Sequence, residues 1–301
     1  MDENNKIKSY VVPSIIVGFV LLLLGLVSWV SPTSLPEKEV LDDVEVAVVP
    51  DEVILPVRWG DLGQQLIAAG VLDAKKFEAV YAGRGGLALA DQSLLYQVNT
   101  GPLVMTEDNS GVVLNLLWAL GLGNKNKILE EGPMVNYDGQ TPTTPLMVRE
   151  KVGGFASTGG WTLSKGHAMD HYSQHRFINL SPDEQDLVER VSKNIYRPCC
   201  GNSTHFPDCN HGLAMLGLLE LMATQGVSET EMYEVALKVN SLWFPDTYLT
   251  LAEYVKIQGG SWDEVDPKEM LSLAYSSSAG YQRILTEVTP VSSGGGGGCS
   301  V

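Results

Sequence analysis

The chain has 301 residues, with 20 Lys+Arg against 36 Asp+Glu and a formal net charge of −16. This charge argues against a nucleic-acid-binding protein, because a phosphate backbone is bound by a basic face. Hydrophobic residues make up 44% of the chain and charged residues 19%, which excludes wholesale disorder, and four Cys are too few for a disulfide-rich scaffold.

Residues 11–30 form an uncharged apolar run, VVPSIIVGFVLLLLGLVSWV. As a helix at ~1.5 Å per residue, this run spans ~30 Å, the hydrocarbon thickness of a bilayer. Tyr10 and Trp29 lie at its ends, where aromatic rings favour the interface, and no small-residue cleavage site follows. We therefore expect residues 11–30 to be an uncleaved transmembrane anchor rather than a signal peptide.

The charges beside this run predict its orientation. Lys6 and Lys8 precede it and a series of acidic residues follows it, so the excess of positive charge lies on the N-terminal side. We therefore expect a single-pass membrane protein with a short cytoplasmic N-terminus, residues 1–10, and the bulk of the chain outside the cytoplasm. The membrane is the partner that this pattern names, and nothing identifies a protein or small-molecule partner.

After the anchor, residues 31–57 are rich in acidic residues and Pro and are expected to be a linker with one strand at Val44–Val49. Residues 58–290 are expected to be a helical domain. Residues 291–301 end in SSGGGGGCSV, a Gly-rich tail that carries Cys299 and is expected to lack fixed structure.

The helical domain shows a repeated local pattern, in which Gly ends one helix and a polar residue caps the next. Gly70 precedes Asp73, and Gly226 precedes a Ser228–Glu231 capping box, so we expect αα-hairpins. The Gly-, Pro- and Thr-rich residues 132–160 predict a long surface loop. Expected helices are Ser110–Leu122, Pro182 to about Tyr196, one capped by Asn210, Glu229–Leu242, Tyr248–Gln258 and Pro267–Thr286. The predicted fold class is therefore mainly α.

The side chains that bind transition metals are concentrated in one part of the chain. All five His and three of the four Cys lie within residues 167–211. The densest part is CCGNSTHFPDCNHG, residues 199–212, which follows one predicted helix and precedes another, so that the ligands can converge. Thiolate and imidazole together favour zinc or copper. The candidate ligands are Cys199, Cys200, Cys209 and His211, with His205 as a substitute.

Two other interpretations of these cysteines stay open. Cys209 precedes a predicted helix, whose N-terminal partial charge favours thiolate, so it can be the nucleophile of a thiol–disulfide protein. Cys199 or Cys200 would then resolve the mixed disulfide, and Cys299 on its flexible tail would be a mobile shuttle. Alternatively, a disulfide from Cys209 to Cys199 or Cys200 staples the loop of a non-catalytic scaffold subunit.

The upstream histidines suggest a second metal site. His167, His171 and His175 recur at every fourth position and on a helix would form one stripe. His167 and His171 can then share an ion, with Asp170 orienting one imidazole, whereas His175 is expected to be a satisfied surface histidine. The sequence contains no phosphate-binding loop, H-E-x-x-H, C-x-x-C-H or G-x-S-x-G motif, so it names no reaction and leaves open whether the protein is an enzyme.

Overall fold

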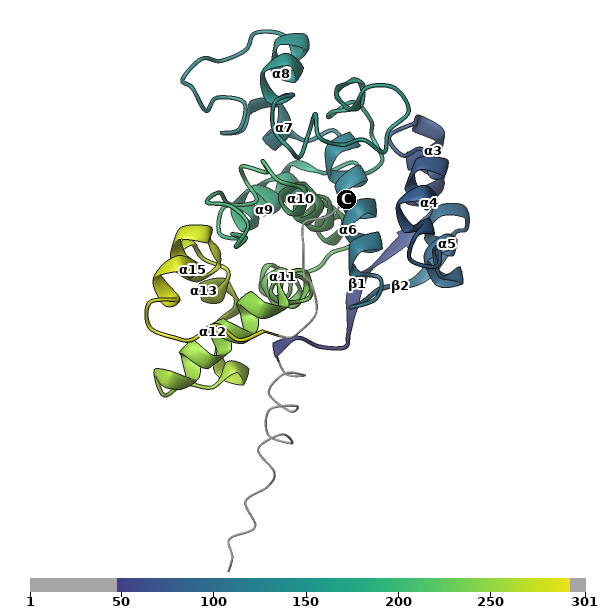
Figure 1. Ribbon diagram of the computed structural model, residues 1–301. Helices are drawn as coiled ribbons and strands as arrows, with labels where there is room; N and C mark the ends of the chain where they lie inside the picture. Colours follow the sequence, from purple (N-terminus) through teal and green to yellow (C-terminus); the bar gives the residue numbers. More distant parts are fainter. Residues whose placement is uncertain (1–47, 293–301) are drawn as a thin grey trace, which may run out of the picture. The chain divides into compact units, whose positions relative to one another are not determined.

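The computed structural model describes residues 48–292 (Figure 1). This part is mainly helical, so the predicted fold class is confirmed to that extent. In chain order the helices and strands are β1 (Glu52–Gly60), α3 (Leu62–Ala69), α4 (Ala74–Ala82), α5 (Leu89–Tyr96), β2 (Asn99–Thr106), α6 (Ser110–Gly123), α7 (Lys127–Glu131), α8 (Pro145–Val152), α9 (Pro182–Ser192), α10 (Asn210–Thr224), α11 (Glu229–Trp243), α12 (Pro245–Ile257), α13 (Pro267–Met270), α14 (Leu273–Ser276) and α15 (Ser278–Ile284), with 3₁₀ turns η1 (Ala168–Asp170) and η2 (Trp262–Glu264).

The expected localisation as a single-pass membrane protein has to be corrected. None of the helices between residues 48 and 292 is long and apolar enough to cross a membrane. The longest of them, α10 and α11, have 15 residues each, whereas a span needs about 20. The expected anchor at residues 11–30 and the tail with Cys299 lie outside the described residues.

A two-stranded antiparallel sheet begins the described part. β1 starts inside the segment assigned to the linker, and it pairs with β2 from Glu52 opposite Thr106 to Gly60 opposite Asn99. Its side chains alternate between exposed and buried, as expected for a strand with one covered face. The strand expected at Val44–Val49 lies mostly outside the described residues. Of that range only residues 48 and 49 are described, and neither is in a strand.

The predicted caps are confirmed where the signal is local. Gly70 ends α3 with φ of 82°, a left-handed conformation that favours Gly, and Asp73 then accepts hydrogen bonds from the first backbone N–H groups of α4. Ser181 and Glu184 form a reciprocal capping box at the start of α9. Ser228 accepts a hydrogen bond from the Glu231 N–H at the start of α11. These caps need only neighbouring residues, so the sequence is sufficient to predict them.

α6 and α10 lie at the centre of the described part and are buried along almost their whole length (Figure 1). Two glycines allow their backbones to approach closely where they cross. A Cβ atom at Gly121 would lie 2.0 Å from the Leu213 carbonyl oxygen, and one at Gly217 would lie 2.6 Å from the Leu117 oxygen. The helix that carries Cys209 at its start is therefore held directly against α6.

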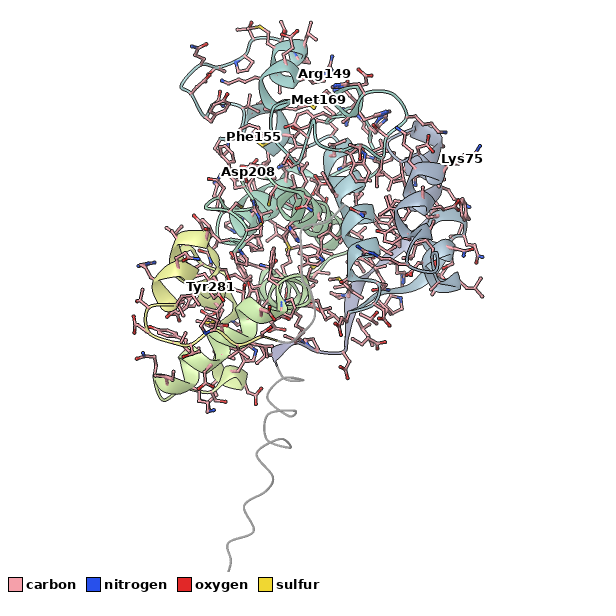
Figure 2. The ribbon with its side chains drawn as sticks, in the orientation of Figure 1. Lys75, Arg149, Phe155, Met169, Asp208 and Tyr281 are labelled. Atoms are coloured by element: carbon pink, nitrogen blue, oxygen red, sulfur yellow. The ribbon has the colours of Figure 1, made fainter. Side chains whose placement is uncertain are left out.

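The surface loop expected at residues 132–160 forms only in part, since residues 137–147 are mostly exposed. The segment contains α8, and its residues Met134, Val135, Val148 and Val152 are part of the hydrophobic core. Trp118 of α6 fixes its end, because its Nε1 donates a hydrogen bond of 2.7 Å to the Ser157 carbonyl. Phe155 packs edge-to-face on Phe206, with ring centroids 5.7 Å apart, close to Asp208 in Figure 2. These contacts with distant residues bury parts of a segment whose composition resembles that of a loop.

Several helix ends also differ from the prediction. α9 ends at Ser192 rather than near Tyr196, and α12 begins at Pro245. The expected helix Pro267–Thr286 is divided into α13, α14 and α15. Ser277 explains the last break, because its hydroxyl accepts a hydrogen bond from the Gly280 N–H and caps a new helix.

Candidate metal centre

The candidate site lies in the segment that joins α9 to α10. Cys209 is the N-cap of α10, and its Sγ accepts a hydrogen bond from the Gly212 N–H at 3.4 Å. We expected Asn210 to be the cap, but its Oδ1 accepts only from the adjacent His211 N–H at 2.9 Å. The sulfur of Cys209 therefore takes the place of a capping oxygen, at the positive end of a 15-residue helix.

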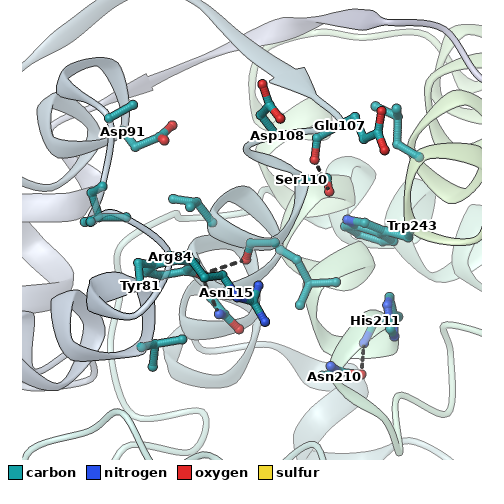
Figure 3. Close-up of a pocket in the computed structure, with 18 of the residues that line it drawn as sticks. Tyr81, Arg84, Asp91, Glu107, Asp108, Ser110, Asn115, Asn210, His211 and Trp243 are labelled. Carbon is teal, nitrogen blue, oxygen red and sulfur yellow. Dashed lines mark hydrogen bonds between the residues drawn. The ribbon is translucent and has the colours of Figure 1, made fainter. Parts of the chain in front are cut away.

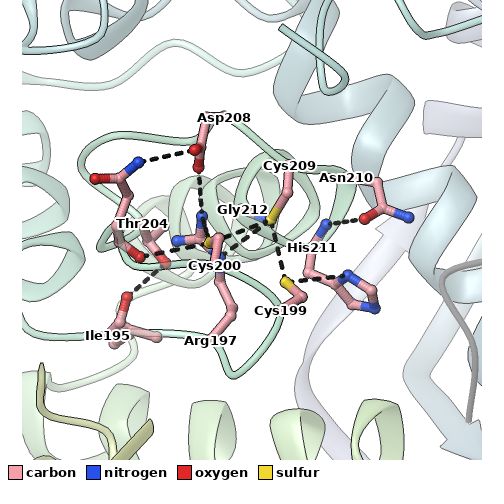
Figure 4. A network of polar contacts seen from close by, with 11 residues as sticks. Ile195, Arg197, Cys199, Cys200, Thr204, Asp208, Cys209, Asn210, His211 and Gly212 are labelled. Carbon is pink, nitrogen blue, oxygen red and sulfur yellow. Dashed lines mark hydrogen bonds and ion pairs between the residues drawn. The ribbon is translucent and has the colours of Figure 1, made fainter. Parts of the chain in front are cut away.

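A buried arginine organises the sulfurs. The side chain of Arg197 is completely buried, and its Nε donates to Cys209 Sγ at 3.3 Å (Figure 4). Its Nη2 donates to Cys200 Sγ at 3.1 Å and to Asp208 Oδ1 at 3.2 Å. Gly212 leaves room for this guanidinium, since a Cβ atom there would lie 2.7 Å from Nη2. Arg197 thus places a buried positive charge beside two cysteine sulfurs and a carboxylate.

Sequence reasoning missed Arg197. The charge of an arginine usually lies at the surface, and nothing in its local pattern shows that its side chain is buried. Its position two residues before the Cys199–Cys200 pair was the one signal, because a guanidinium next to cysteines lowers thiol pKa values.

The sulfur and nitrogen atoms have the spacing of a metal site. Cys209 Sγ lies 3.5 Å from Cys199 Sγ and 3.8 Å from Cys200 Sγ, and Cys199 Sγ lies 4.0 Å from His211 Nδ1. A tetrahedral zinc ion with Zn–S bonds of about 2.3 Å separates two sulfurs by about 3.8 Å. A disulfide instead needs about 2.05 Å, and the structure shows Cys199, Cys200 and Cys209 as thiols.

Two ligand groups share Cys209. The first is Cys199, Cys209 and His211, and the second is Cys200, Asp208 and Cys209, each with ligand atoms within 4.8 Å of one another. Arg197 donates to all three residues of the second group, so a cation there would meet a buried positive charge. The first group, called the Cys/His triad below, shares only Cys209 with that arginine and is the better place for a metal ion.

The hydrogen bonds between the sulfurs set different pKa values for the cysteines. Hydrogen bonds from Cys199 and Cys200, together with the Arg197 charge, hold the pKa of Cys209 well below its ordinary value although burial opposes this. For Cys200 the hydrogen bond with Cys199 lowers the pKa, but the hydrogen bond with Cys209 and burial outweigh it and raise the pKa to about 11. Cys209 is therefore the thiolate of the cluster, the form that binds metal.

His211 is held in an aromatic environment. Its ring centroid lies 4.4 Å from that of Phe244 and 5.4 Å from that of Trp243, and the residue is 4% exposed. This packing restricts the imidazole and keeps Nδ1 on the side of Cys199, as Figure 4 shows. A restricted ligand loses less conformational entropy when it binds a metal.

The other predicted ligands do not join this cluster. His205 lies with Nδ1 3.2 Å from the Ser192 hydroxyl and is in neither ligand group. His167 and Asp170 cap the short turn η1 with their side chains, so the helical stripe does not form. His171 Nδ1 instead lies 3.2 Å from His175 Nε2, and the His171 Nε2 lies 2.8 Å from the Lys165 carbonyl. Among the described residues, neither group with metal-site spacing includes His167, His171 or Asp170.

The Cys/His triad can hold a metal ion, and its thiols are close enough to react with one another. Comparison of the chain with models of protein families, with curated proteins and with solved structures finds no match in any of the three.

Proposed function

We propose that the protein binds one transition-metal ion, zinc or copper, through Cys199, Cys209 and His211. The observation that carries this proposal is the spacing of the donor atoms, 3.5 Å between the two sulfurs and 4.0 Å from sulfur to Nδ1. Both values are close to the edges of a tetrahedron around an ion with bonds of about 2.0–2.3 Å. Thiolate and imidazole together are ligands that suit zinc and copper.

The role that fits three protein ligands is storage or transfer of the ion, or a structural site completed by a fourth ligand. Cys200 is the nearest further sulfur, but its Sγ accepts a hydrogen bond from Arg197. The ion would neutralise the Cys209 thiolate, and Arg197 would hold that sulfur in place by its hydrogen bond. Metal binding and the deprotonation of the thiols are then coupled, so affinity should rise with pH.

The experiment is a titration of the reduced full-length chain with cobalt(II), a spectroscopic stand-in for zinc. We expect one equivalent to bind, with a sulfur-to-cobalt charge-transfer band. Cys199→Ser, Cys209→Ser and His211→Gln should each lower the affinity by about tenfold or more, as should any loss of a ligand. His205→Gln is the matched control and should bind as the unchanged protein does. A stoichiometry below about a tenth, or normal binding by Cys209→Ser, would show that the triad holds no metal.

A thiol–disulfide function is the second candidate, and one observation favours it. The exposed Cys199 lies 3.5 Å from Cys209, whose pKa is lowered by hydrogen bonds from Cys199 and Cys200. In this case the Cys199 and Cys209 thiols form a disulfide, and two electrons and two protons pass to an acceptor disulfide of a partner. Counting free thiols in the metal-free, denatured chain distinguishes the two candidates. A reducible disulfide that leaves Cys200 as a thiol favours either this function or the stapling role expected from the sequence. Turnover with a disulfide substrate would favour the thiol–disulfide function over the stapling role.

A further inference from the structure

A cavity of about 590 Å³ lies beside the Cys/His triad, and the proposed metal binding does not involve it. Its walls come from α4, α5 and the segment between them, α6 and the residues before it, the start of α10 and the junction of α11 and α12 (Figure 3). His211 is part of the wall, so one residue borders both the triad and the cavity. This volume suits a small organic molecule.

Two buried polar side chains in the wall have an atom that no described residue satisfies. Asn115 is 3% exposed and its Oδ1 accepts no hydrogen bond, while Trp243 is 6% exposed and its Nε1 donates none within residues 48–292. The amide of Asn115 is oriented, because its Nδ2 donates to the Tyr81 hydroxyl at 2.8 Å and that hydroxyl donates to the Gly111 carbonyl at 3.1 Å. Native proteins rarely leave such atoms unsatisfied, so both atoms are available to the polar groups of a molecule in the cavity. Asn115 Oδ1 can accept a hydrogen bond from a ligand, and Trp243 Nε1 can donate one.

The charges of the wall favour a cation. Asp91, Glu107 and Asp108 line the cavity together with one positive side chain, Arg84, which gives three negative charges against one positive. Asp91 is 6% exposed, and it accepts a long hydrogen bond of 3.4 Å from Asn109 Nδ2. Burial raises the pKa of this carboxyl, which shows that its charge is poorly compensated. A ligand with a positive group would compensate it.

We propose that this cavity binds a small organic amine that also carries an oxygen acceptor. The ammonium group would lie toward Asp91 and the other carboxylates, and an N–H or O–H of the ligand would bind Asn115 Oδ1. The ligand oxygen would accept from Trp243 Nε1. Leu114 and Leu242, which also line the cavity, would contact the apolar body. This binding does not depend on the proposed metal function, because no triad residue other than His211 lines the cavity.

The test uses four matched probes in isothermal titration calorimetry with the full-length chain. Phenylalaninol carries the amine, the oxygen and an apolar body; phenylpropanol lacks the amine, phenethylamine lacks the oxygen, and phenylpropionate has the opposite charge. We expect phenylalaninol to bind with a Kd of about 1 mM or tighter. Phenylpropanol and phenethylamine should bind about tenfold more weakly, and phenylpropionate should not bind.

Two variants connect this binding to the cavity. Trp243→Phe keeps the ring but removes the unsatisfied N–H, and Asp91→Asn removes the buried charge, so each should weaken phenylalaninol about tenfold. Trp262→Phe, which changes a tryptophan outside the cavity, is the control and should have no effect. Absence of phenylalaninol binding, equal affinity for phenylpropionate, or unchanged affinity of Trp243→Phe would each overturn the proposal. Cobalt binding by Asp91→Asn should stay normal, which keeps this result separate from that of the metal site.

Discussion

Glu220 should make the stability of the protein fall as the pH rises. This carboxyl lies inside α10 with no exposed surface, where it accepts hydrogen bonds from Asn124 Nδ2 at 3.0 Å and Asn126 Nδ2 at 2.5 Å. Burial raises its pKa from 4.5 to about 8, and the two amide donors offset only part of this effect. At neutral pH the folded state therefore holds a proton on Glu220 that the unfolded chain releases.

The sign and size of the effect follow from proton linkage. Because the folded pKa lies above the unfolded value, the stabilising contribution is complete below about 4.5 and is lost as the pH rises through about 8. With 1.36 kcal/mol per pKa unit, the free energy of unfolding should fall by about 3.5 kcal/mol between about pH 5 and about pH 8.

Glu220→Gln is the variant that tests this, because glutamine keeps the shape and does not titrate. Its amide nitrogen would face one of the two asparagine donors, so the variant should be less stable at about pH 5 by about 1–3 kcal/mol. The assay is urea unfolding followed by far-UV circular dichroism at several pH values. The gap in stability between the two proteins should shrink by about 3.5 kcal/mol toward about pH 8, or reverse. A gap that stays constant within about 0.5 kcal/mol would refute the reasoning.

Three further predictions concern the helix crossing, the arginine and a cap. Gly121→Ala should lower the free energy of unfolding by about 2 kcal/mol or more, because its Cβ atom would lie 2.0 Å from the Leu213 oxygen. Gly111→Ala in the same helix is the control, since a Cβ atom there meets nothing within 4 Å, and it should be neutral or stabilising. Equal denaturation midpoints of the two variants would contradict this. Arg197→Met should raise the Cys209 pKa, measured from the pH profile of thiol alkylation in metal-free protein, and should weaken cobalt binding about 10- to 100-fold. Arg190→Met, which removes an exposed ion pair, is the control and should change neither property. Asp73→Ala should cost about 1 kcal/mol in thermal unfolding because α4 loses its cap, and Asp73→Asn should recover most of it; an alanine variant as stable as the parent would rule out the cap.

The parts of the fold that depend on neighbouring residues were predictable from the sequence. The stop at Gly70, the cap at Asp73 and the capping box at Ser181 each need only a few consecutive residues, and each forms as expected. The partial burial of residues 132–160 was not predictable, because it depends on contacts with distant residues such as Trp118. β1 was hidden by the Pro residues around it, although its alternation of buried side chains is clear once the strand is known.

The candidate site divides in the same way. Cys199, Cys209 and His211 could be named from their density in a short loop, and the structure brings their donor atoms together. The role of Arg197 and the exclusion of His205 could not be predicted, since both depend on which side of the segment faces the interior. The stripe of His167 and His171 was expected because periodicity alone cannot distinguish a helix from a chain of turns.

The crossing of α6 and α10 determines where α10 holds the candidate metal ligands at its start. Gly217 lies eight residues after Cys209, which is about 12 Å along the helix axis. A tilt of α10 by about 5° about Gly217 would move the start of the helix, with Cys209, by about 1 Å. This is more than the roughly 0.5 Å within which the atoms of a binding site must be held. Gly121 and Gly217 therefore control the position of candidate ligands that neither glycine contacts. Gly121→Ala should lower the affinity for a metal ion although it changes no ligand.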